Sequence, residues 1–555
     1  MKKNIFLYHT IITLLSFFSA EALNKPRLTI IIVVDQFAQD YIQKIKPYLK
    51  HGLRELISNG VYYPNAYMPH AMPATGPGHT ALNTGTYAKD HGIVLNEWVN
   101  EQGKNVICDG DSAENAAVFS PTGTYNYGRS ARLIMIDGLS DQFMLHSTEE
   151  NPRYVFALSL KSRSAIGSAS KLGKAIWFDE KEGLFTSSKA YFEELPAWIK
   201  TFNTTQGINE LDHVFWHQAK PSSSRAYQFV NPKSYEFIID DAIRVGQSIP
   251  IEREAKPDEP FHLFVQTPQA NKLLFDLARK CIQVHCNKQN NTDLLLWLDL
   301  SSLDKLGHIH GPDSKEVLDM IYHLDKQLAC FMRFAQRTAG TKNTLFVLTA
   351  DHGIAPIPEV VKQAGLPAVR IIKKDLIERS NAYLQKGHGI ANAIYKFKFP
   401  QFFLNQDAFS LLSREKKHEI LKDLQSFLQK QPGIKRAWTN KELDTQCFEP
   451  NSIENYFKQQ RYPGRSGSLF IQVTPYSHFT KWEKGTSHRS PYKFDLHIPL
   501  VLYQRGSIEL KTIGKDVSAL QLANTLADIL QIPRPSASTI ERLPGLDEEL
   551  DYLAR

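Results

Sequence analysis

The sequence of 555 residues contains little cysteine, and its cysteines form no zinc-knuckle pattern. The five cysteines are Cys108, Cys281, Cys286, Cys330 and Cys447. Cys281 and Cys286 are close enough in sequence to pair in an oxidising compartment, although the connectivity cannot be read from sequence. The odd number leaves at least one thiol free, unless a bridge joins two chains.

A strong charge of one sign is also missing. The formal net charge of +7 is spread over a large chain, so we expect no nucleic-acid partner, while a small anionic substrate is compatible with it. A hydrophobic share of 42% and a charged share of 22% are typical of a globular protein. The length allows one large α/β domain with insertions, or two or three ordinary domains.

After the N-terminus, no apolar run approaches the ~20 residues that span a bilayer, so we expect no stable membrane insertion. The N-terminus itself is typical of a signal peptide: Lys2 and Lys3, an apolar stretch at residues 11–18, and an A-x-A pattern ending at Ala22. The alternative, a buried first helix, is disfavoured because residues 24–26 (Asn-Lys-Pro) interrupt it. We therefore expect a periplasmic or secreted protein, with residues 1–22 removed.

Strand-like and helix-like segments alternate along the chain, which favours an α/β/α sandwich with a mostly parallel central sheet. Apolar runs typical of buried strands lie at residues 27–34, 154–160, 294–300, 344–349, 469–473 and 498–503. Three-to-four spacing predicts amphipathic helices at residues 317–331 and 520–530. Residues 23–555 are expected to form one catalytic domain, with inserted cap segments at roughly 180–291 and 354–484, where the alternation breaks down.

Metal-type ligands follow several of these expected strands. Asp35 ends the first apolar run, and Asp351 and His352 end the run at 345–350. Asp304 and His308 follow the run at 294–301 with i, i+4 spacing, which places them on one face if the segment is helical. Ligands bind outside the carboxyl ends of parallel strands, and carboxylate with imidazole suits zinc and similar cations. Each pair alone could make an ordinary turn; their joint position favours a metallohydrolase.

Thr75 lies within residues 73–79 (Pro-Ala-Thr-Gly-Pro-Gly-His), where Pro and Gly suggest a tight turn into a helix. A hydroxyl at a helix N-terminus lies among free backbone N–H groups, which favour phosphate. Coordination to a divalent metal would make it a nucleophile. The alternative is that Thr75 simply caps the helix.

Together these segments resemble the alkaline phosphatase superfamily, and specifically its phosphate-irrepressible alkaline phosphatase branch, related to nucleotide pyrophosphatase/phosphodiesterases. The matching segments, which extend over nearly all of the mature chain, include residues 33–36 (Val-Val-Asp-Gln), 75–79, 96–98 (Asn-Glu-Trp), 159–163 (Ser-Leu-Lys-Ser-Arg), 303–308, 349–353 (Thr-Ala-Asp-His-Gly) and 488–492 (His-Arg-Ser-Pro-Tyr). The branch usually has Gly after its last metal-binding His, whereas this chain has Arg489, which puts substrate preference in doubt.

The resemblance implies two Zn²⁺ ions and a set of site residues. One zinc would be held by Asp35, Asp351 and His352 and would activate Thr75. The second would be held by Asp304, His308 and His488. Asn96, Lys161 and Arg163 match the branch's phosphate-binding residues; the alternative for the two cations is a solvated position at a strand end.

The expected activity is hydrolysis of a small phosphate monoester through a phospho-threonine intermediate. A phosphodiesterase or nucleotide pyrophosphatase on the same scaffold is one alternative, and an inactive phosphate- or metal-binding protein is another. A sulfatase is disfavoured because Thr75 stands where that family needs a modified Cys or Ser.

Overall fold

The computed structural model describes residues 24–546, except 208–212, 241, 251–258, 287–290 and 481. The expected signal peptide, residues 1–22, lies outside the described residues. Within the described part of the chain, no helix combines the length and apolar character needed to cross a bilayer. All five cysteines are unpaired, including Cys281 and Cys286, which are both buried.

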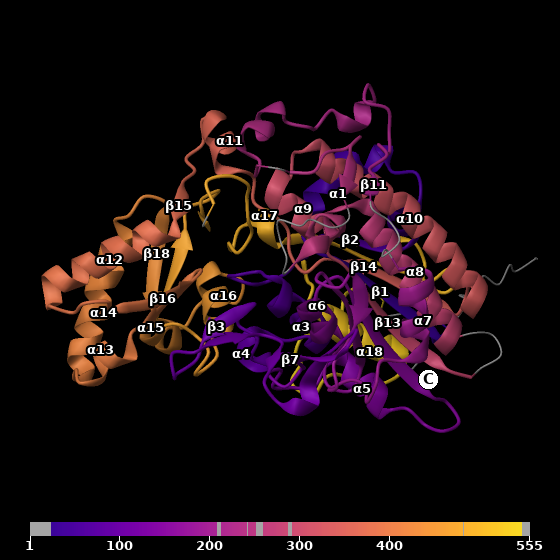
Figure 1. Cartoon of the computed structure of the whole chain (residues 1–555), viewed down its shortest axis with the longest axis horizontal. Coiled ribbons are helices and arrows are strands. Elements are labelled where there is room, and N and C mark those ends of the chain that lie inside the picture. The colour runs from indigo at the N-terminus through magenta and orange to yellow at the C-terminus, as the bar shows by residue number, and fades with distance from the viewer. Residues whose placement is uncertain are drawn as a thin grey trace, which may run out of the picture.

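A sheet of ten strands runs through the centre of the molecule (Figure 1). Nine strands follow the order β10-β9-β8-β13-β1-β14-β21-β2-β22, and β23 also pairs with β2. Their bounds are β1 (Leu28–Val34), β2 (Val61–Tyr67), β8 (Arg153–Ser159), β9 (Lys174–Asp179), β10 (Leu184–Thr186), β13 (Asp293–Leu300), β14 (Thr344–Thr349), β21 (His497–Tyr503), β22 (Lys511–Thr512) and β23 (Val517–Ser518).

The middle of this sheet is parallel, as expected for fully apolar strands. β9, β8, β13, β1 and β14 are parallel neighbours, and in their register Ile31 lies between Trp297 and Val347. Every residue of β1, β13 and β14 is buried. β10 and β21 pair with their neighbours in antiparallel fashion, so the sheet is mostly rather than wholly parallel.

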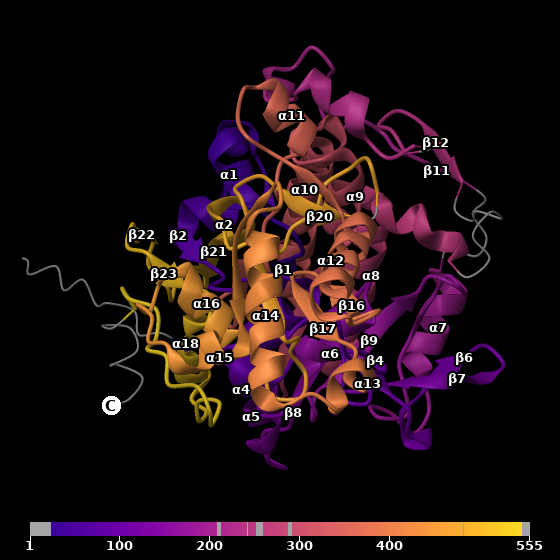
Figure 2. The same ribbon diagram turned by 90° about the vertical axis from the view of Figure 1, so that its left-hand side faces the viewer.

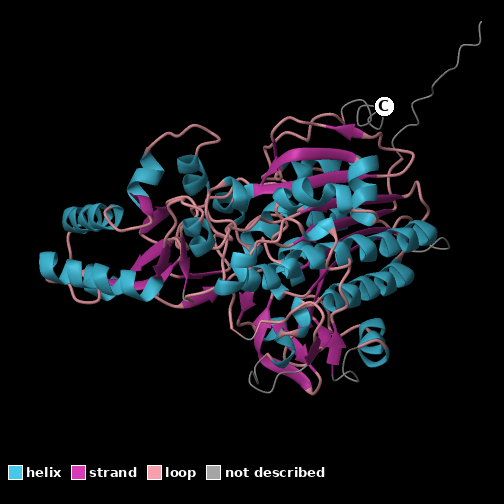
Figure 3. Ribbon diagram, turned by 90° about the horizontal axis from the view of Figure 1, so that it is seen from above, coloured by secondary structure: helices cyan, strands magenta, loops and turns pink. Residues whose placement is uncertain are grey.

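Two groups of helices cover the sheet, which confirms the α/β/α sandwich (Figures 1 and 3). The long helix α10 packs against α2, α8 and α9, and α18 packs with α3 and α5. The bounds are α1 (Gln39–Ile45), α2 (Gly52–Asn59), α3 (Thr75–Thr84), α4 (Ala88–His91), α5 (Leu139–Leu145), α6 (Ser162–Ala169), α7 (Ala197–Thr205), α8 (Pro268–His285), α9 (Ser302–His310), α10 (Lys315–Ala339) and α18 (Gln521–Leu530). α10 and α18 contain the two helices expected from periodicity.

A smaller lobe projects from one end of the sandwich (Figures 1 and 2). Its antiparallel sheet has the order β16 (Ile394–Lys398), β17 (Gln401–Leu404), β19 (Leu469–Val473) and β18 (Ile434–Thr439). The helices α12 (Lys373–His388) and α14 (Arg414–Gln429) pack on it around a separate hydrophobic cluster. Residues 469–473 were expected to resemble the central strands; they instead lie in this second sheet, because a short apolar run does not encode its partner strand.

Four further small sheets complete the described part of the chain. β3 (Glu97–Val99) pairs with β4 (Asn105–Ile107), and β7 (Gly123–Arg129) pairs with β5 (Gly110–Asp111) and β6 (Ala117–Ser120). β11 (His213–Phe215) pairs with β12 (Ser248–Pro250), and β15 (Arg370–Ile372) with β20 (His478–Thr480). α8, near the end of the stretch from 180 to 291, packs on β8 and β13 and so contributes to the main helical layer.

Candidate metal centre

The strand-end residues meet at one edge of the central sheet. Asp35 directly follows β1, Lys161 follows β8, Asp304 lies in α9 just after β13, and Asp351 with His352 follows β14. Because β8, β13, β1 and β14 are adjacent and parallel, their carboxyl ends lie side by side. Each of these side chains is buried. The order of these four adjacent strands therefore brings residues from four separate segments of the chain into one buried cluster.

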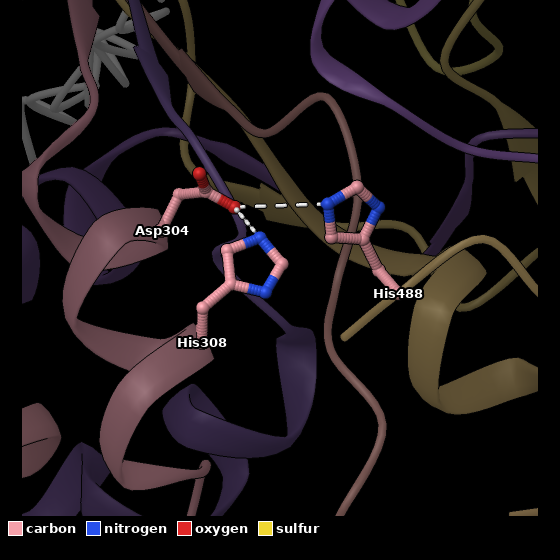
Figure 4. A group of neighbouring side chains, drawn as sticks. All are labelled: Asp304, His308 and His488. Carbon is pink, nitrogen blue, oxygen red and sulfur yellow. Dashed lines mark ion pairs between the residues drawn. The ribbon is translucent and has the colours of Figure 1, made fainter. Parts of the chain in front are cut away.

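Asp304, His308 and His488 form the first group of ligand-type side chains (Figure 4). Asp304 and His308 project from one face of α9, as their i, i+4 spacing predicts, and His488 approaches from the opposite side on a loop. Asp304 Oδ1 lies 3.2 Å from His308 Nε2 and 3.8 Å from His488 Nε2. The three ligand atoms all lie within 4.8 Å of one another.

Asp35, Asp304 and His352 form a second group with ligand atoms within the same 4.8 Å limit. His352 Nε2 is 3.5 Å from Asp35 Oδ1 and 3.3 Å from Asp351 Oδ2, so Asp351 borders this group. The resemblance places Asp351 among the ligands and assigns Asp304 to the other metal alone. In the structure Asp304 is common to both groups, which makes it the link between the two.

The three imidazoles are oriented to bind metals through Nε2. Each uses Nδ1 to contact a backbone carbonyl: His308 with Thr486 O at 3.0 Å, His352 with Gly353 O at 2.9 Å, and His488 with Pro73 O at 2.8 Å. A carbonyl oxygen only accepts, so Nδ1 carries a proton in each ring and Nε2 faces the carboxylates. Burial alone would lower the pKa of His308, but Asp304 outweighs it and the pKa is raised, so a metal at this position must displace a proton from His308 Nε2. Burial, reinforced by the charge of His352, keeps the pKa of His488 well below its usual range and favours its neutral form.

The buried carboxylates carry more negative charge than the nearby protein groups compensate. Burial alone would raise the pKa of Asp304, but the Lys161 ammonium and His308 outweigh it and hold that pKa well below its usual range. Burial and the charge of Asp35 raise the pKa of Asp351 well above its usual range. Among the described residues, Asp35 Oδ1, Asp351 Oδ2 and His352 Nε2 are buried without hydrogen-bond partners. Bound divalent cations fit this donor set, since they would satisfy these atoms and balance the charge.

Lys161 is buried among the ligand-type carboxylates and does not merely line the entrance to the site. Its ammonium is 2.6 Å from Asp35 Oδ2 and 2.5 Å from Asp304 Oδ2. Burial alone would lower the pKa of Lys161, yet the two carboxylates outweigh it and the pKa is raised. Lys161 therefore stays charged and bridges the two groups of ligand-type side chains, in addition to lining the cavity above them.

Thr75 is the first residue of α3, and the residue at the N-cap is Ala74. The hydroxyl of Thr75 therefore does not cap its own helix, unlike the alternative considered from sequence. Asn96 Oδ1 accepts a hydrogen bond of 2.8 Å from the Gly76 N–H, which ties the expected phosphate-binding Asn96 to this helix end. A Cβ added at Gly78 would lie 2.8 Å from the Cβ of Asp351, so glycine is required for α3 to approach the carboxylate cluster this closely.

A cavity of about 460 Å³ opens above the cluster. It is lined by Thr75, Asn96, Lys161, Arg163 and the three residues of Figure 4, among others. Arg163 lies in the first turn of α6, where free N–H groups already favour an anion. Thr75, the expected phosphate-binding residues and the Asp304 group thus line a single cavity, whose cations suit an anionic substrate. Asp35, Asp351 and His352 do not line it and lie buried beside Asp304.

Gln36 is a site residue that sequence reasoning noticed only as part of the family motif. Its backbone N–H donates to Asp351 Oδ1 at 3.2 Å and its amide Nε2 donates to Asp304 Oδ1 at 2.8 Å. Its φ of 68° lies in the left-handed region, which costs a non-glycine residue free energy. A Cβ at Gly307 would lie only 1.9 Å from Gln36 Oε1, so Gly307 makes room for this contact. Neither hydrophobic periodicity nor composition signals such a bridging role.

Acid should destabilise the fold through buried imidazoles around this centre. Burial lowers the pKa to about 3 for His70, His310 and His478, and to about 4 for His79. Histidines in the unfolded chain have pKa values of ~6.5, so below that pH the unfolded state binds protons that the buried imidazoles of the folded state do not bind. The free energy of unfolding therefore falls as the pH drops below ~6.5. We expect the thermal unfolding midpoint, measured in EDTA, to fall progressively towards acid.

His478→Asn, whose amide does not titrate, is the matched variant for this effect. It should show a smaller acid shift than the parent protein. A midpoint that stays constant from neutral to acid pH would contradict the expected burial of neutral imidazoles.

Comparison with known proteins identifies the family of this chain. Residues 29–495 match the family described as type I phosphodiesterase / nucleotide pyrophosphatase. The chain is 27% identical to alkaline phosphatase PhoV of Synechococcus elongatus, over 93% of this chain and 92% of that protein. It is 26% identical to alkaline phosphatase PafA of Elizabethkingia meningoseptica, over 93% and 94%.

The fold agrees as well. The crystal structure of wild-type PafA has a TM-score of 0.80 to this chain at 25% identity and covers 94% of this chain and 99% of that one. The matched family extends over most of the chain, including every strand-end residue of the metal centre. The protein therefore belongs to the type I phosphodiesterase/nucleotide pyrophosphatase family, in the PafA-like, phosphate-irrepressible branch of the alkaline phosphatase superfamily.

Proposed function

We propose that this protein is a two-zinc phosphate monoester hydrolase that acts through a covalent phospho-threonine at Thr75. The observation that carries the proposal is a single cavity lined by Thr75, by the Asp304 group and by the cations Lys161 and Arg163. Carboxylate and imidazole donors favour zinc over harder cations such as magnesium. Relatives named alkaline phosphatase support the same reaction class.

Zinc ions in these two groups would supply Lewis-acid chemistry, stabilising negative charge on the oxygens of a transferring phosphoryl group. In the first step, Thr75 Oγ forms a bond to phosphorus while the bond to the leaving oxygen breaks, and the proton lost by the Thr75 hydroxyl is balanced by the one that the departing alcohol gains. In the second step, a water oxygen forms a bond to phosphorus while the bond from phosphorus to Thr75 Oγ breaks; inorganic phosphate departs and a proton from that water restores the Thr75 hydroxyl. The position of Thr75 at the start of α3 supports this role, because the free N–H groups there favour the negative charge of a bound phosphoryl group.

Asn96, Lys161 and Arg163 are proposed to bind the oxygens of the phosphoryl group. The Arg163 guanidinium can donate two hydrogen bonds to phosphate oxygens, and Lys161 adds a compact charge. A monoester presents three free phosphoryl oxygens and two negative charges, whereas a diester has one fewer charge and a second substituent near these cations. The positive charges of Lys161 and Arg163 in the cavity therefore favour the monoester over the diester.

A diesterase or nucleotide pyrophosphatase is the second candidate, because the matched family is described by those activities. Comparing kcat/KM for p-nitrophenyl phosphate and bis-p-nitrophenyl phosphate separates the two, and a preference for the diester would overturn the monoesterase assignment. An inactive binding protein, the third candidate, would hydrolyse neither ester. The complete set of ligand-type side chains argues against it.

Removing Lys161 and Arg163 together should change the substrate preference. Each charged hydrogen bond is worth roughly 1.5–3 kcal/mol, so the Lys161→Ala/Arg163→Ala variant should lose on the order of a hundredfold or more in monoesterase kcat/KM. Diesterase kcat/KM should fall much less, since a diester offers fewer free charged oxygens. Steady-state kinetics with the two p-nitrophenyl esters measures both.

Metal content must be determined in parallel, because Lys161 also contacts Asp35 and Asp304. The single variant Arg163→Ala, which leaves that contact intact, is the control for metal loss. An equal fall in both activities with metals retained would argue that the two cations are structural.

We further propose that the protein is exported after cleavage near Ala22. We also propose that the stretches at 180–291, apart from β10 and α8, and at 354–484 act as inserted caps on one catalytic domain. The proposal for export rests on the basic, apolar and small-residue pattern of the N-terminus. Fractionation of cells that produce the full-length chain, with N-terminal sequencing of the mature protein, tests it. Uncleaved protein retained in the cytoplasm would contradict it.

A further inference from the structure

Arg489 occupies a backbone position that is unfavourable for any residue with a side chain. Its φ is 92°, in the left-handed region that glycine adopts freely. Arginine here carries a conformational cost, and such strain persists only where the surrounding structure imposes it. The residue follows His488, which belongs to the group in Figure 4. Arg489 therefore combines a strained backbone with a place directly beside the metal centre.

The Arg489 side chain lines two cavities. One is the cavity above the metal centre, and the other is a side cavity of about 160 Å³ towards the smaller lobe. Asn96 lines both cavities as well, so the two meet at Asn96 and Arg489. The leaving group of a substrate whose phosphoryl group lies at the metal centre is therefore in the cavity that the Arg489 side chain also lines.

The side cavity has a predominantly cationic lining. Besides Arg489 it contains Lys373 and Lys398, with Glu97 as its acidic residue. The Glu97 carboxylate is already paired, since it lies 2.5 Å from Lys398 Nζ and accepts a hydrogen bond of 3.1 Å from Asn105. The lining therefore keeps a net positive charge after this pair is counted. Lys373 and Lys398 come from the smaller lobe and Arg489 from the loop beside the metal centre.

Arg489 also lacks a full set of protein partners. Its Nε is buried without a hydrogen-bond partner among the described residues, and the same holds for Arg163 Nε. Arg163 and Arg489 both line the cavity above the metal centre, so the two guanidiniums gather at one site. Gathering like charges and leaving their donors unpaired costs free energy unless an anion binds between or beside them.

We propose that Arg489, in a side cavity whose lining keeps a net positive charge, forms a subsite for a second anionic group carried by the leaving group. The preferred substrates are then phosphate monoesters whose leaving group bears a carboxylate or another phosphate within reach of the side cavity. This inference rests on the proposed monoesterase function and adds a substrate class to it. Arg489 is a specificity-determining residue, because it binds the part of the substrate that does not react.

Three substrates with the same propyl chain test the subsite: propyl phosphate, 3-carboxypropyl phosphate and propane-1,3-diol bisphosphate. The kcat/KM of the wild-type enzyme should be on the order of tenfold higher for 3-carboxypropyl phosphate and for the bisphosphate than for propyl phosphate. This is the gain expected from charge-assisted hydrogen bonds to the second anionic group. The bisphosphate offers two equivalent reacting groups, so its rate is compared per phosphoryl group. A larger gain for the carboxylate or for the phosphate identifies which anion the subsite takes.

Arg489→Gly and Arg489→Asn should abolish most of this preference. Glycine and asparagine both tolerate the left-handed region, so neither variant is expected to unfold for backbone reasons. Arg436→Gln removes a surface arginine of β18 that pairs with Glu454, and it should leave the preference unchanged. The ratio of kcat/KM values is the readout, so a general loss of activity does not mimic the expected result.

The outcomes distinguish this inference from the function on which it rests. Thr75-dependent hydrolysis of all three esters at equal efficiency would overturn the subsite and leave the monoesterase intact. A preference that survives Arg489→Gly and Arg489→Asn would also overturn it. No Thr75-dependent hydrolysis of any of the three would overturn the proposed function and the subsite together.

Discussion

Thr75→Ala is expected to lower kcat for p-nitrophenyl phosphate by on the order of a thousandfold or more, because it removes the protein oxygen proposed to attack phosphorus in the first step. The structure allows a clean test of this role. Thr75 is the first residue of α3, its hydroxyl does not cap the helix, and Ala is a strong helix former. The substitution should therefore leave the helix, the metal ligands and the cavity in place.

Thr75→Ser is the matched variant, since it keeps the oxygen and loses only a methyl group. It should retain substantial activity, and both variants should retain the metal content of the parent protein. Mass spectrometry of protein quenched during turnover should detect a phosphorylated residue at position 75 in the parent and in Thr75→Ser. Near-native turnover by Thr75→Ala would rule out the covalent mechanism.

Asp304→Asn is expected to remove both metal ions and to abolish activity. Asp304 belongs to both groups of ligand-type side chains, and it is the one residue common to the two among the described residues. Asn has nearly the same size, but its neutral amide lacks the charge and the second acceptor oxygen that a bridging position needs. Elemental analysis of the purified variant, together with kcat/KM, measures both effects.

His308→Ala and His488→Ala are the comparison variants, because each removes a ligand from one group alone. Each should lose mainly one metal per chain, and zinc added after chelation should restore activity in the parent protein but not in Asp304→Asn. Activity should also fall in acid, because protons compete with metal for imidazole and carboxylate. Two metals per chain in Asp304→Asn would contradict the shared position, and one metal or none in the active parent would contradict the two-zinc site.

Much of the fold could be predicted from local patterns. The apolar runs at β1, β13 and β14 predicted buried parallel strands, and the spacing in α10 predicted a long amphipathic helix. The run at 469–473 carried the same signal and yet lies in the smaller lobe. Strand pairing depends on contacts between residues far apart in sequence, and no short window of sequence contains that information.

The candidate site divides in the same way. The sequence by itself determined which residue types follow the strands, and the i, i+4 spacing placed Asp304 and His308 on one face of α9. Parallel strands end at a common edge, so a cluster of ligands there followed from the fold class alone.

Only the tertiary structure decided how these groups meet. In the tertiary structure, Asp304 is common to both groups of ligand-type side chains, and the Lys161 ammonium lies between Asp35 and Asp304. Gln36 has a strained backbone conformation and contacts Gly307 closely. In the same way, Arg489 lines both the cavity above the metal centre and the side cavity. The physical reason is that burial, charge pairing and backbone strain depend on neighbours from distant parts of the chain, whereas hydrophobic periodicity reports only on neighbours along it.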